Sequence, residues 1–450
     1  MNSLFDFSIL FCLLSSVAFI AIFLYSTYIF YIENEKRAAF RALLIGLLLP
    51  IPYFIAWHYD FNILALILFA DLILTGLLFL YPFKTSKKIC DDIPLTKIDE
   101  RNVMFSRNEL VIGSDHYKEY YAKNPEKEEL DNLFRKEAGL CSEKSLFNHT
   151  FAFAAAHASF FTIGQFKKAV DGQVNSPRKE TSSNEMSAFL KAWGKKLGAL
   201  DIGFCELKDY HLYSHKGRGE EYGNEVHNTH SHAIAFTVEM TEEMVKAAPQ
   251  SSIVMESAQQ YLDSGRIAIQ IAEFLRHLGY SARAHIDGNY QVVCPLVARD
   301  SGLGEIGRMG LLMTPQQGPR VRLGVVTTEF PLNTEDRKKL NYMLDFCLHC
   351  KKCADVCPSK SISSDHPKMV DGIKRWQINS ESCFTYWCKA GTDCGRCMAT
   401  CPYSHPDNLL HNAIRLGIKY SPLFRRIAAP LDDFFYGRKP KSKKLPKWIN

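Results

Sequence analysis

The sequence predicts a mixed fold of helices and strands that follows three membrane-spanning helices, and three features carry this prediction. The first 83 residues hold three long apolar runs, and residues 151–330 alternate between helical and strand-like hydrophobic patterns. Nine of the 14 cysteines lie between Cys347 and Cys401. The 450 residues suffice for two or three domains of about 100–200 residues each. An apolar content of 47% excludes a largely disordered chain, and a net charge of +6 does not indicate a nucleic-acid binder.

The three apolar runs have the length of spanning helices, which need about 20 apolar residues. They cover residues 7–32, 42–57 and 63–83, and the second run contains two prolines that predict a kink. Lys and Arg follow the first and third runs, but the second loop has none, so the positive-inside rule predicts an outside N-terminus. We therefore expect a multi-pass protein of the inner (cytoplasmic) membrane, without a twin-arginine leader and with its remaining residues on the cytoplasmic side.

The rest of the chain divides by composition. We expect five parts: a three-helix membrane anchor (1–83), a tether and wrapping segment (84–150), a catalytic domain (151–335), a cysteine-rich domain (336–412) and a C-terminal segment with a basic tail (413–450). Within them, strands are predicted over 197–207, 233–240, 291–297 and 321–328, and a long helix over 253–278. The basic tail is solvated or touches anionic lipid.

The strongest motif is a pair of cysteine runs. The first is Cys347-x2-Cys350-x2-Cys353-x3-Cys357-Pro358, and the second is Cys383, Cys394, Cys397 and Cys401-Pro402. The first run has the bacterial ferredoxin spacing, in which the fourth Cys ligates the other cluster. This predicts two 4Fe–4S clusters, one held by Cys347, Cys350, Cys353 and Cys401 and the other by Cys357, Cys383, Cys394 and Cys397. Zinc sites usually use paired CxxC or Cys/His motifs, and disulfides do not fit a cytoplasmic domain, so both alternatives are disfavoured. Cys388 is the one cysteine of this region that is not assigned as a ligand.

Two weaker patterns are less specific. Gly302, Gly304 and Gly307 match a dinucleotide fingerprint, but no strand precedes them. We interpret them as a Gly-rich loop whose backbone closely approaches a large ligand. The histidine-rich stretch 227–232 is interpreted as a polar loop rather than a metal site.

Several segments together resemble the corrinoid-dependent reductive dehalogenases over residues from about 100 to about 438. They are GRGEEYGNE (217–225), FLRHLGY (274–280), GLGEIGR (302–308), GPRVR (318–322), TTEFPL (327–332), FCLHCKKC (346–353), CFTYW (383–387) and DDFFYGR (432–438). The resemblance implies a nitroreductase-like α+β corrinoid-binding domain joined to a ferredoxin-like domain with two 4Fe–4S clusters. It also implies bound cobalamin as the second cofactor.

The resemblance further implies site residues and an activity. Tyr261 matches the family's proton donor, Arg320 or Arg322 the basic residue beside it, and Asn289 a polar pocket residue. Two arginines two residues apart point the same way if extended. The expected activity is two-electron reductive removal of halide from a small organohalide. The alternatives are an epoxyqueuosine-reductase-like corrinoid reductase and a membrane electron-transfer iron–sulfur protein. The expected partners are membrane lipid and an electron donor (a ferredoxin, a flavodoxin or a quinone-linked donor), without nucleic acid; a homodimer stays open.

Overall fold

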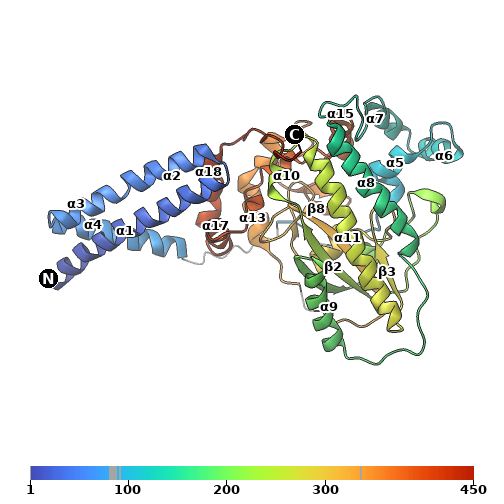
Figure 1. Cartoon of the computed structure of the whole chain (residues 1–450), viewed down its shortest axis with the longest axis horizontal. Helices are drawn as coiled ribbons and strands as arrows, with labels where there is room; N and C mark the ends of the chain where they lie inside the picture. Colours follow the sequence, from blue (N-terminus) through green and yellow to red (C-terminus); the bar gives the residue numbers. More distant parts are fainter. Residues whose placement is uncertain (1, 81–88, 91–92, 335–336, 450) are drawn as a thin grey trace. The chain divides into compact units, whose positions relative to one another are not determined.

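The computed structural model describes residues 2–80, 89–90, 93–334 and 337–449. By their internal contacts these residues form two units. The first unit combines residues 1–87 with residues 407–440, and the second combines residues 88–406 with residues 441–450. The ribbon in Figure 1 follows the chain through both units.

The first unit is entirely helical. Its elements are α1 (Asn2–Ile32), α2 (Lys36–Leu48), α3 (Pro50–His58), α4 (Asn62–Leu80), α17 (Leu409–Tyr420) and α18 (Pro422–Tyr436). Three stretches among the described helices are long and apolar enough to cross a membrane: Asp6–Ile32, Lys36–His58 and Asn62–Phe79. The second stretch joins α2 to α3 at Pro50, where the sequence predicted a kink. The three predicted apolar helices are thus confirmed, and the side of the membrane stays a prediction.

The two C-terminal helices pack with the anchor. Phe30, Ala38 and Ala42 form one buried cluster, against which Leu410, Phe435 and Tyr436 pack. The His411 imidazole lies 3.0 Å from the Glu33 carboxylate, and both side chains are buried. The predicted C-terminal segment 413–450 is therefore divided, because residues up to 440 join the anchor and residues 441–450 join the second unit.

A four-stranded antiparallel sheet forms the centre of the second unit. Its order is β1 (Asp201–Glu206), β2 (His232–Glu239), β6 (Val321–Thr328) and β3 (Ala282–His285). Three of these strands match predicted ones, and β3 was missed because it is short and contains Arg283 and His285. The predicted strand 291–297 is wrong: its second half begins the helix α12 (Cys294–Asp300), where Pro295 occupies the first turn, a position that favours helix initiation.

Alternate residues of the sheet pack into two separate layers. Ile234, Phe236 and Val326 face a core that includes Ile267 and Ile271 of α11 (Ser252–His277). Ala233, Ala235 and Val325 contact Val297 of α12 on the other face. The period-2 alternation places a helical layer on each side of the sheet. In Figure 1 the helix α11 runs along the sheet beside α8 (Thr150–Phe166), with α9 (Ser183–Leu197) nearby.

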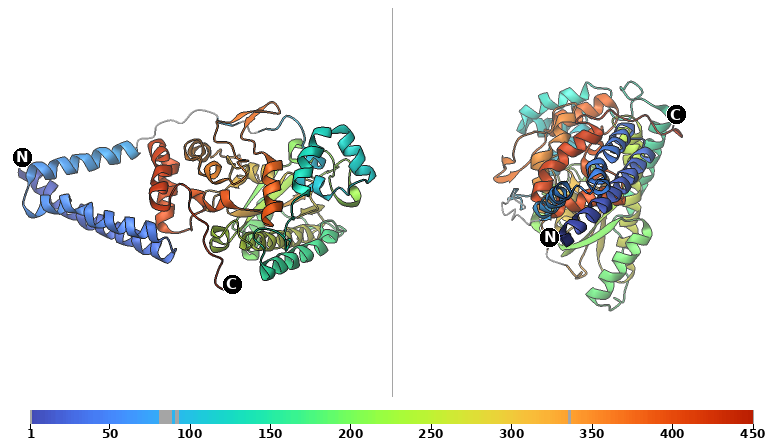
Figure 2. Two further views of the ribbon diagram at one scale, coloured as in Figure 1. Left: turned by 90° about the horizontal axis from the view of Figure 1, so that it is seen from above. Right: turned by 90° about the vertical axis from the view of Figure 1, so that its left-hand side faces the viewer.

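Shorter elements surround the sheet. They are α5 (Met104–Glu109), α6 (Asp115–Lys123), α7 (Pro125–Arg135), α10 (Glu242–Lys246), α13 (Asn341–Cys350), α14 (Lys352–Val356), α15 (Ser380–Ala390) and α16 (Arg396–Ala399), with the hairpins β4 (Glu305–Ile306)–β5 (Leu312–Met313) and β7 (Lys368–Val370)–β8 (Ile373–Arg375). The helices α13 to α16 carry most of the clustered cysteines. Figure 2 shows this orange segment beside the sheet.

Candidate functional site

A cavity of about 480 Å³ lies in the second unit, where the sheet meets the cysteine-rich segment. Its wall is built from α11, the start of β6, the loop after β3, and α15 with the loop that follows it. Most of the lining residues are aliphatic or aromatic; they include Phe105, Phe160, Tyr213, Val254, Tyr290, Leu311, Leu312, Leu323, Phe384 and Trp387. A largely apolar concave wall with a few polar groups is typical of a small-molecule site.

The polar groups of the cavity centre on Arg322. Its guanidinium donates hydrogen bonds to the Ser257 hydroxyl at 2.6 Å and to the Asp393 carboxylate at 2.8 Å. The same guanidinium lies over the Tyr261 ring, 5.1 Å from the ring centroid. Among the described residues, the buried Nε of Arg322 and the buried Oδ1 of Asp393 have no hydrogen-bond partner. Buried polar atoms without partners are costly, so these two fit a ligand that brings polar groups into the cavity.

Tyr261 is brought to this site by the predicted helix α11. The ring is partly buried and packs against the core of the sheet and near Phe160. Burial raises the pKa of the Tyr261 hydroxyl above its ordinary value, and the Arg322 charge only partly opposes this effect. Burial therefore outweighs the effect of the Arg322 charge on the Tyr261 pKa, and the phenol keeps its proton at neutral pH.

Two aspartate carboxyl groups line the cavity, in addition to that of Glu109. Burial raises the pKa of Asp393 and the pKa of Asp287, while the charge of Arg322 lowers both in part. Arg218 completes the polar set and donates a hydrogen bond to the Tyr290 hydroxyl at 3.1 Å. The cavity thus combines Arg218, Arg322, three carboxyl groups and the protonated Tyr261 in a largely apolar wall.

The structure separates the two candidate arginines. Arg320 is fully buried and donates to the Met240 carbonyl (2.5 Å), the Glu239 carboxylate (2.6 Å) and the Ser404 carbonyl (3.2 Å). Only Arg322 lies in β6 itself, since the strand begins at Val321. The expectation that both side chains point the same way therefore does not hold, and Arg322 is the one beside Tyr261.

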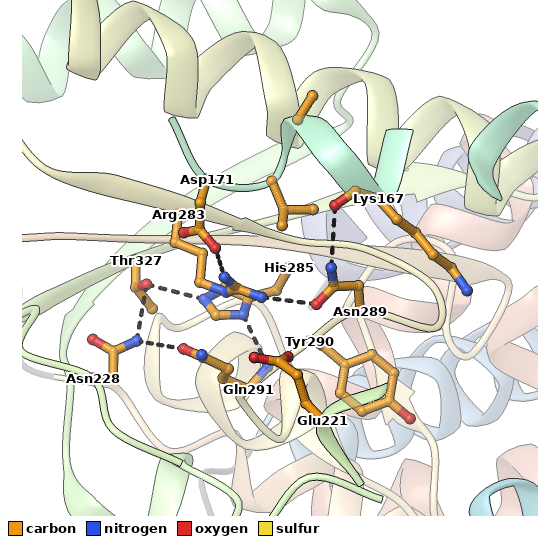
Figure 3. Close-up of polar contacts among 12 residues, drawn as sticks. Lys167, Asp171, Glu221, Asn228, Arg283, His285, Asn289, Tyr290, Gln291 and Thr327 are labelled. Atoms are coloured by element: carbon orange, nitrogen blue, oxygen red, sulfur yellow. Dashed lines mark hydrogen bonds and ion pairs between the residues drawn. The ribbon is translucent and has the colours of Figure 1, made fainter. Parts of the chain in front are cut away.

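Asn289 is not among the residues that line the cavity, and Figure 3 shows its polar contacts. Its side chain accepts a hydrogen bond from Arg283 at 2.8 Å and donates one to the Lys167 carbonyl at 3.2 Å. Arg283 in turn pairs with Asp171. Two residues earlier, Asp287 lines the cavity. The role of Asn289 as a pocket residue stays a prediction.

The glycine motif packs against its own chain. A Cβ atom on Gly304 would lie 2.1 Å from the Met313 carbonyl oxygen, and one on Gly307 would lie 2.3 Å from the Met313 sulfur. Gly302 adopts a φ of +82° at the turn before them. The close approach that we expected for a large ligand is thus made by β5. The hairpin contributes Leu311 and Leu312 to the cavity wall instead.

The eight candidate cluster ligands gather in two neighbouring groups. Burial raises the pKa of Cys353, and the thiols of Cys347, Cys350, Cys397 and Cys401 lie close enough to raise it further. Burial likewise raises the pKa of Cys394 to about 12, with Cys383 and Cys357 as nearby thiols. Cys397 interacts with the thiols of this second group as well.

This grouping agrees with the division that the ferredoxin spacing predicts, with Cys397 between the two sets. A donor set of four thiols per group fits an iron–sulfur cluster. No group of three or more Cys, His, Asp or Glu side chains in the part of the chain that the structure describes is close enough for a single metal ion. The assignment of individual ligands stays a prediction.

Two residues near the clusters behave differently from the ligands. Cys388, the predicted spare, is buried with Phe134 and Phe384 in an apolar cluster. Arg308 is fully buried and donates to the Cys347 carbonyl at 3.0 Å and to the carbonyls of Ser363 and Asp365. The sequence analysis assigned no role to Arg308. Its position directly after Gly307, at the end of the glycine motif, could have marked it as a candidate.

The second cysteine group borders the cavity. Phe384, which follows Cys383, and Asp393, which precedes Cys394, both line the cavity. Trp387 lies one helical turn after Cys383 and lines it as well. Residues beside this cysteine group therefore line the same cavity as Tyr261 and Arg322.

The histidine-rich stretch is held by ordinary hydrogen bonds. The His230 ring nitrogens lie 2.8 Å from the Thr327 hydroxyl and 2.9 Å from the Ser281 hydroxyl. The Asn228 amide donates to Thr327 at 3.3 Å, as Figure 3 shows. The stretch leads into β2, as predicted.

Comparison with protein families matches residues 346–405 to the 4Fe-4S dicluster domain. The match covers seven of the eight candidate ligands in its interior and Cys401 near its end. The prediction of a domain with two 4Fe–4S clusters is thereby confirmed.

The chain is similar to curated reductive dehalogenases and, over a shorter stretch, to an epoxyqueuosine reductase. The chain is 32% identical to a tetrachloroethene reductive dehalogenase of Desulfitobacterium hafniense over 213 residues, which are 45% of this chain and 38% of that protein. It is 32% identical to the tetrachloroethene reductive dehalogenase of Sulfurospirillum multivorans over 222 residues, 47% of this chain and 43% of the relative. An epoxyqueuosine reductase of Atelocyanobacterium thalassa is 33% identical over 116 residues, 24% of this chain and 36% of that protein. The chain thus spans less than half the length of these relatives.

Solved structures share the fold. A catabolic reductive dehalogenase, NpRdhA, superposes with a TM-score of 0.60 at 21% identity, covering 72% of this chain and 51% of that chain. Another reductive dehalogenase structure, described with a mechanism for B12-dependent dehalogenation, gives a TM-score of 0.59 at 23% identity, covering 78% and 49%. The mixed α+β fold with its iron–sulfur segment is therefore that of a reductive dehalogenase.

Proposed function

We propose that this homologue of the reductive dehalogenases removes halide from a small organohalide by two-electron reduction. The balanced reaction is R–X + 2e⁻ + H⁺ → R–H + X⁻. One observation carries the proposal: an apolar cavity holds a protonated tyrosine beside an arginine, and the second cysteine group borders the same cavity. The proposed proton donor, Tyr261, and the proposed electron source, the second cysteine group, thus meet at the same cavity.

The electrons enter through the cysteine-rich segment. We assign Cys347, Cys350, Cys353 and Cys401 to one 4Fe–4S cluster and Cys357, Cys383, Cys394 and Cys397 to the other. A corrinoid bound in the cavity would supply the cobalt centre that reduces the carbon–halogen bond. The unpartnered polar atoms of Arg322 and Asp393 would meet polar substituents of such a ligand, and the apolar wall would contact its carbon skeleton. The helical layers on both faces of the antiparallel sheet support the finer assignment of this part to a nitroreductase-like domain.

Tyr261 holds the proton that replaces the halogen. Its raised pKa keeps the hydroxyl protonated at neutral pH, as a general acid requires. Once the proton leaves, the Arg322 charge 5.1 Å from the ring stabilises the phenolate, because opposite charges attract strongly in an apolar cavity. Ser257 and Asp393 fix the guanidinium in this place through two hydrogen bonds.

The substrate is a small organohalide. NpRdhA, which has the same fold, has been described in complex with 3-bromo-4-hydroxybenzoic acid. Here the rings of Phe105, Phe160 and Tyr290 offer apolar contacts to a compact halogenated molecule and exclude water from the reacting carbon. The epoxyqueuosine-reductase alternative has less support, since that match covers a quarter of the chain.

Anaerobic purification of the full chain with cobalt and iron analysis tests this function, followed by a panel of chlorinated and brominated compounds. We expect about eight irons and one cobalt per chain, from two 4Fe–4S clusters and one corrinoid. Halide should be released from at least one compound with a strong reductant. Full iron without cobalt would support the electron-carrier alternative, and full cofactor content without halide release would contradict the proposal.

A further inference from the structure

The helices α17 and α18 of the first unit each expose apolar side chains while some of their polar side chains are buried. The polar side chains of His411 and Arg415 on α17 are buried, as is Arg425 on α18. Large apolar side chains of the same helices are exposed instead, including Leu409 at 72% and Leu416 at 56%. A helix of a soluble protein shows the opposite arrangement, with its apolar face buried.

The exposed apolar residues form one stripe on each helix. On α17 the stripe is Leu409, Ala413, Leu416 and Tyr420, and on α18 it is Leu423, Ile427, Pro430, Leu431 and Phe434. Positions separated by 4, 7, 8 and 11 residues fall within an arc of about 100° on an α-helix with 3.6 residues per turn. The exposure is therefore a continuous face on each helix, and contiguous apolar faces mark interaction sites.

The inward faces of the two helices are fixed by polar contacts to the anchor. The buried His411 pairs with Glu33, which also accepts a hydrogen bond from Asn408 at 2.9 Å. Arg425 donates to the Ile418 carbonyl at 2.9 Å and so joins α18 to α17. The outward direction of the apolar stripes is thus determined by buried hydrogen bonds.

Both helices lie where the spanning helices end. Glu33 directly follows the end of α1 at Ile32, and α2 starts at Lys36. The Phe424 ring packs against Phe79 near the end of α4, with the ring centroids 5.7 Å apart. In the left view of Figure 2, the dark red helix α18 runs across these helix ends rather than along them. This level corresponds to the boundary between hydrocarbon and lipid headgroups.

Exposed cations flank the apolar stripes. Lys419 lies beside the α17 stripe, Arg426 beside the α18 stripe, and Lys36 and Arg37 begin α2 at the same end of the bundle. Arg41 lies over the Phe434 ring at 4.5 Å. Aromatic and aliphatic side chains beside Lys and Arg are the composition of helices that lie in a membrane interface and contact anionic headgroups.

We propose that α17 and α18 lie in the plane of the membrane interface and insert their apolar stripes among the lipids. The continuity of the stripes with the spanning helices favours a lipid surface over a second copy of the chain. The C-terminal part of the chain would then be held at the bilayer by two interfacial helices in addition to the spanning ones.

Photo-crosslinking in the full-length protein tests this proposal. The chain is reconstituted in phosphatidylcholine–phosphatidylglycerol vesicles, with p-benzoylphenylalanine in place of Leu416 in one variant and of Ile427 in another. The matched control replaces Leu133, a 52% exposed leucine on α7 of the other unit. We expect phospholipid adducts at positions 416 and 427 at least about tenfold above the control, since interfacial helices bury their apolar face at the acyl boundary.

Two results would overturn the proposal. One is a lipid adduct yield at positions 416 and 427 no higher than at position 133. The other is crosslinking of these positions chiefly to a second copy of the chain, which would assign the stripes to a dimer interface. Two separate variants keep the test valid if one of them fails to insert.

Discussion

Arg320 and Arg322 show how two like residues, two positions apart, take different places. The first donates to Glu239 and to two carbonyls outside the cavity, and the second lies over Tyr261 inside it. Strand alternation would have placed both on one face, but the strand begins only at Val321. The sequence could nominate both arginines, and only the tertiary partners could separate them.

Replacing each arginine by Gln should therefore have different effects: one substitution should lower activity, and the other should lower stability. Arg322→Gln should lower dehalogenation about 10- to 100-fold, because hydrogen bonds to charged groups contribute about 1.5–3 kcal/mol. Arg320→Gln should lower the free energy of unfolding by a similar amount and leave the activity of the folded protein nearly unchanged. Rate measurements and urea unfolding of both variants separate the roles, and the reverse pattern would return Arg320 to the site.

Cys383 and Cys388, both on α15, allow a matched comparison of a proposed cluster ligand with a cysteine that is not assigned as a ligand. Cys383→Ala should remove about four irons per chain, the content of one 4Fe–4S cluster. Cys388→Ala should remove none, because Cys388 lies in an apolar cluster with Phe134 and Phe384. Iron analysis of both variants decides the matter, and equal losses would refute the ligand role of Cys383.

At the scale of elements, the helix α15 is tied to the wrapping segment by one carboxylate. Glu381, in the first turn of α15, accepts hydrogen bonds from Lys127 of α7 at 2.8 Å and from Arg107 of α5 at 3.0 Å. Burial would raise the pKa of Glu381, but the hydrogen bonds from Lys127, the backbone and Arg107 hold it at about 2. Because α15 also carries Cys383, this pairing positions the cavity wall and one cluster ligand together.

Glu381→Gln should lower the free energy of unfolding by about 1.5–3 kcal/mol at pH 7. A carboxyl whose folded-state pKa is lowered stabilises the fold above its ordinary pKa and loses this effect as the pH falls. The difference between wild type and Glu381→Gln should therefore shrink as the pH falls from about 4.5 towards 2. Urea unfolding at several pH values measures this difference in the free energy of unfolding. The control is Glu129→Gln, at an exposed position on α7. A difference that does not change with pH would contradict the pairing.

Several elements followed from local patterns and others did not. The helix 253–278 and the strands near 201, 232 and 321 have clear hydrophobic periodicity, and the structure contains them. The strand 291–297 was predicted wrongly because its apolar run suits either element, and Pro295 decided for a helix. The roles of Asp287 and Asp393 depend on which side chains reach the cavity, which no local pattern encodes.

At the scale of the whole molecule, the chain combines a helical unit, which has three helices long and apolar enough to span a membrane, with a second unit that holds the candidate site. The sequence predicted the three apolar helices from their length, but it could not predict that α17 and α18 join them. That association rests on contacts such as Glu33 with His411, which are 378 residues apart in sequence. Residues 441–450 join the second unit instead, where Gln250 donates to the Lys443 carbonyl at 2.6 Å.

The positive-inside rule predicts that the second unit lies in the cytoplasm. A reporter fused after Lys88, a position outside the described residues, should be active only if the reporter works in the cytoplasm. Alkaline phosphatase and green fluorescent protein fusions at that position give opposite readouts. A phosphatase-positive fusion would contradict the predicted orientation.

The most direct test of the account is halide release by the cofactor-loaded full-length protein and by its Tyr261→Phe variant. The wild type should release one halide per two electrons consumed, as the reaction requires. The variant should be slower by about 10²–10⁴, the usual contribution of a general acid, with unchanged iron and cobalt content because Phe preserves the packing of the ring. Undiminished halide release by Tyr261→Phe, or none by fully loaded wild type on any organohalide, would contradict the account.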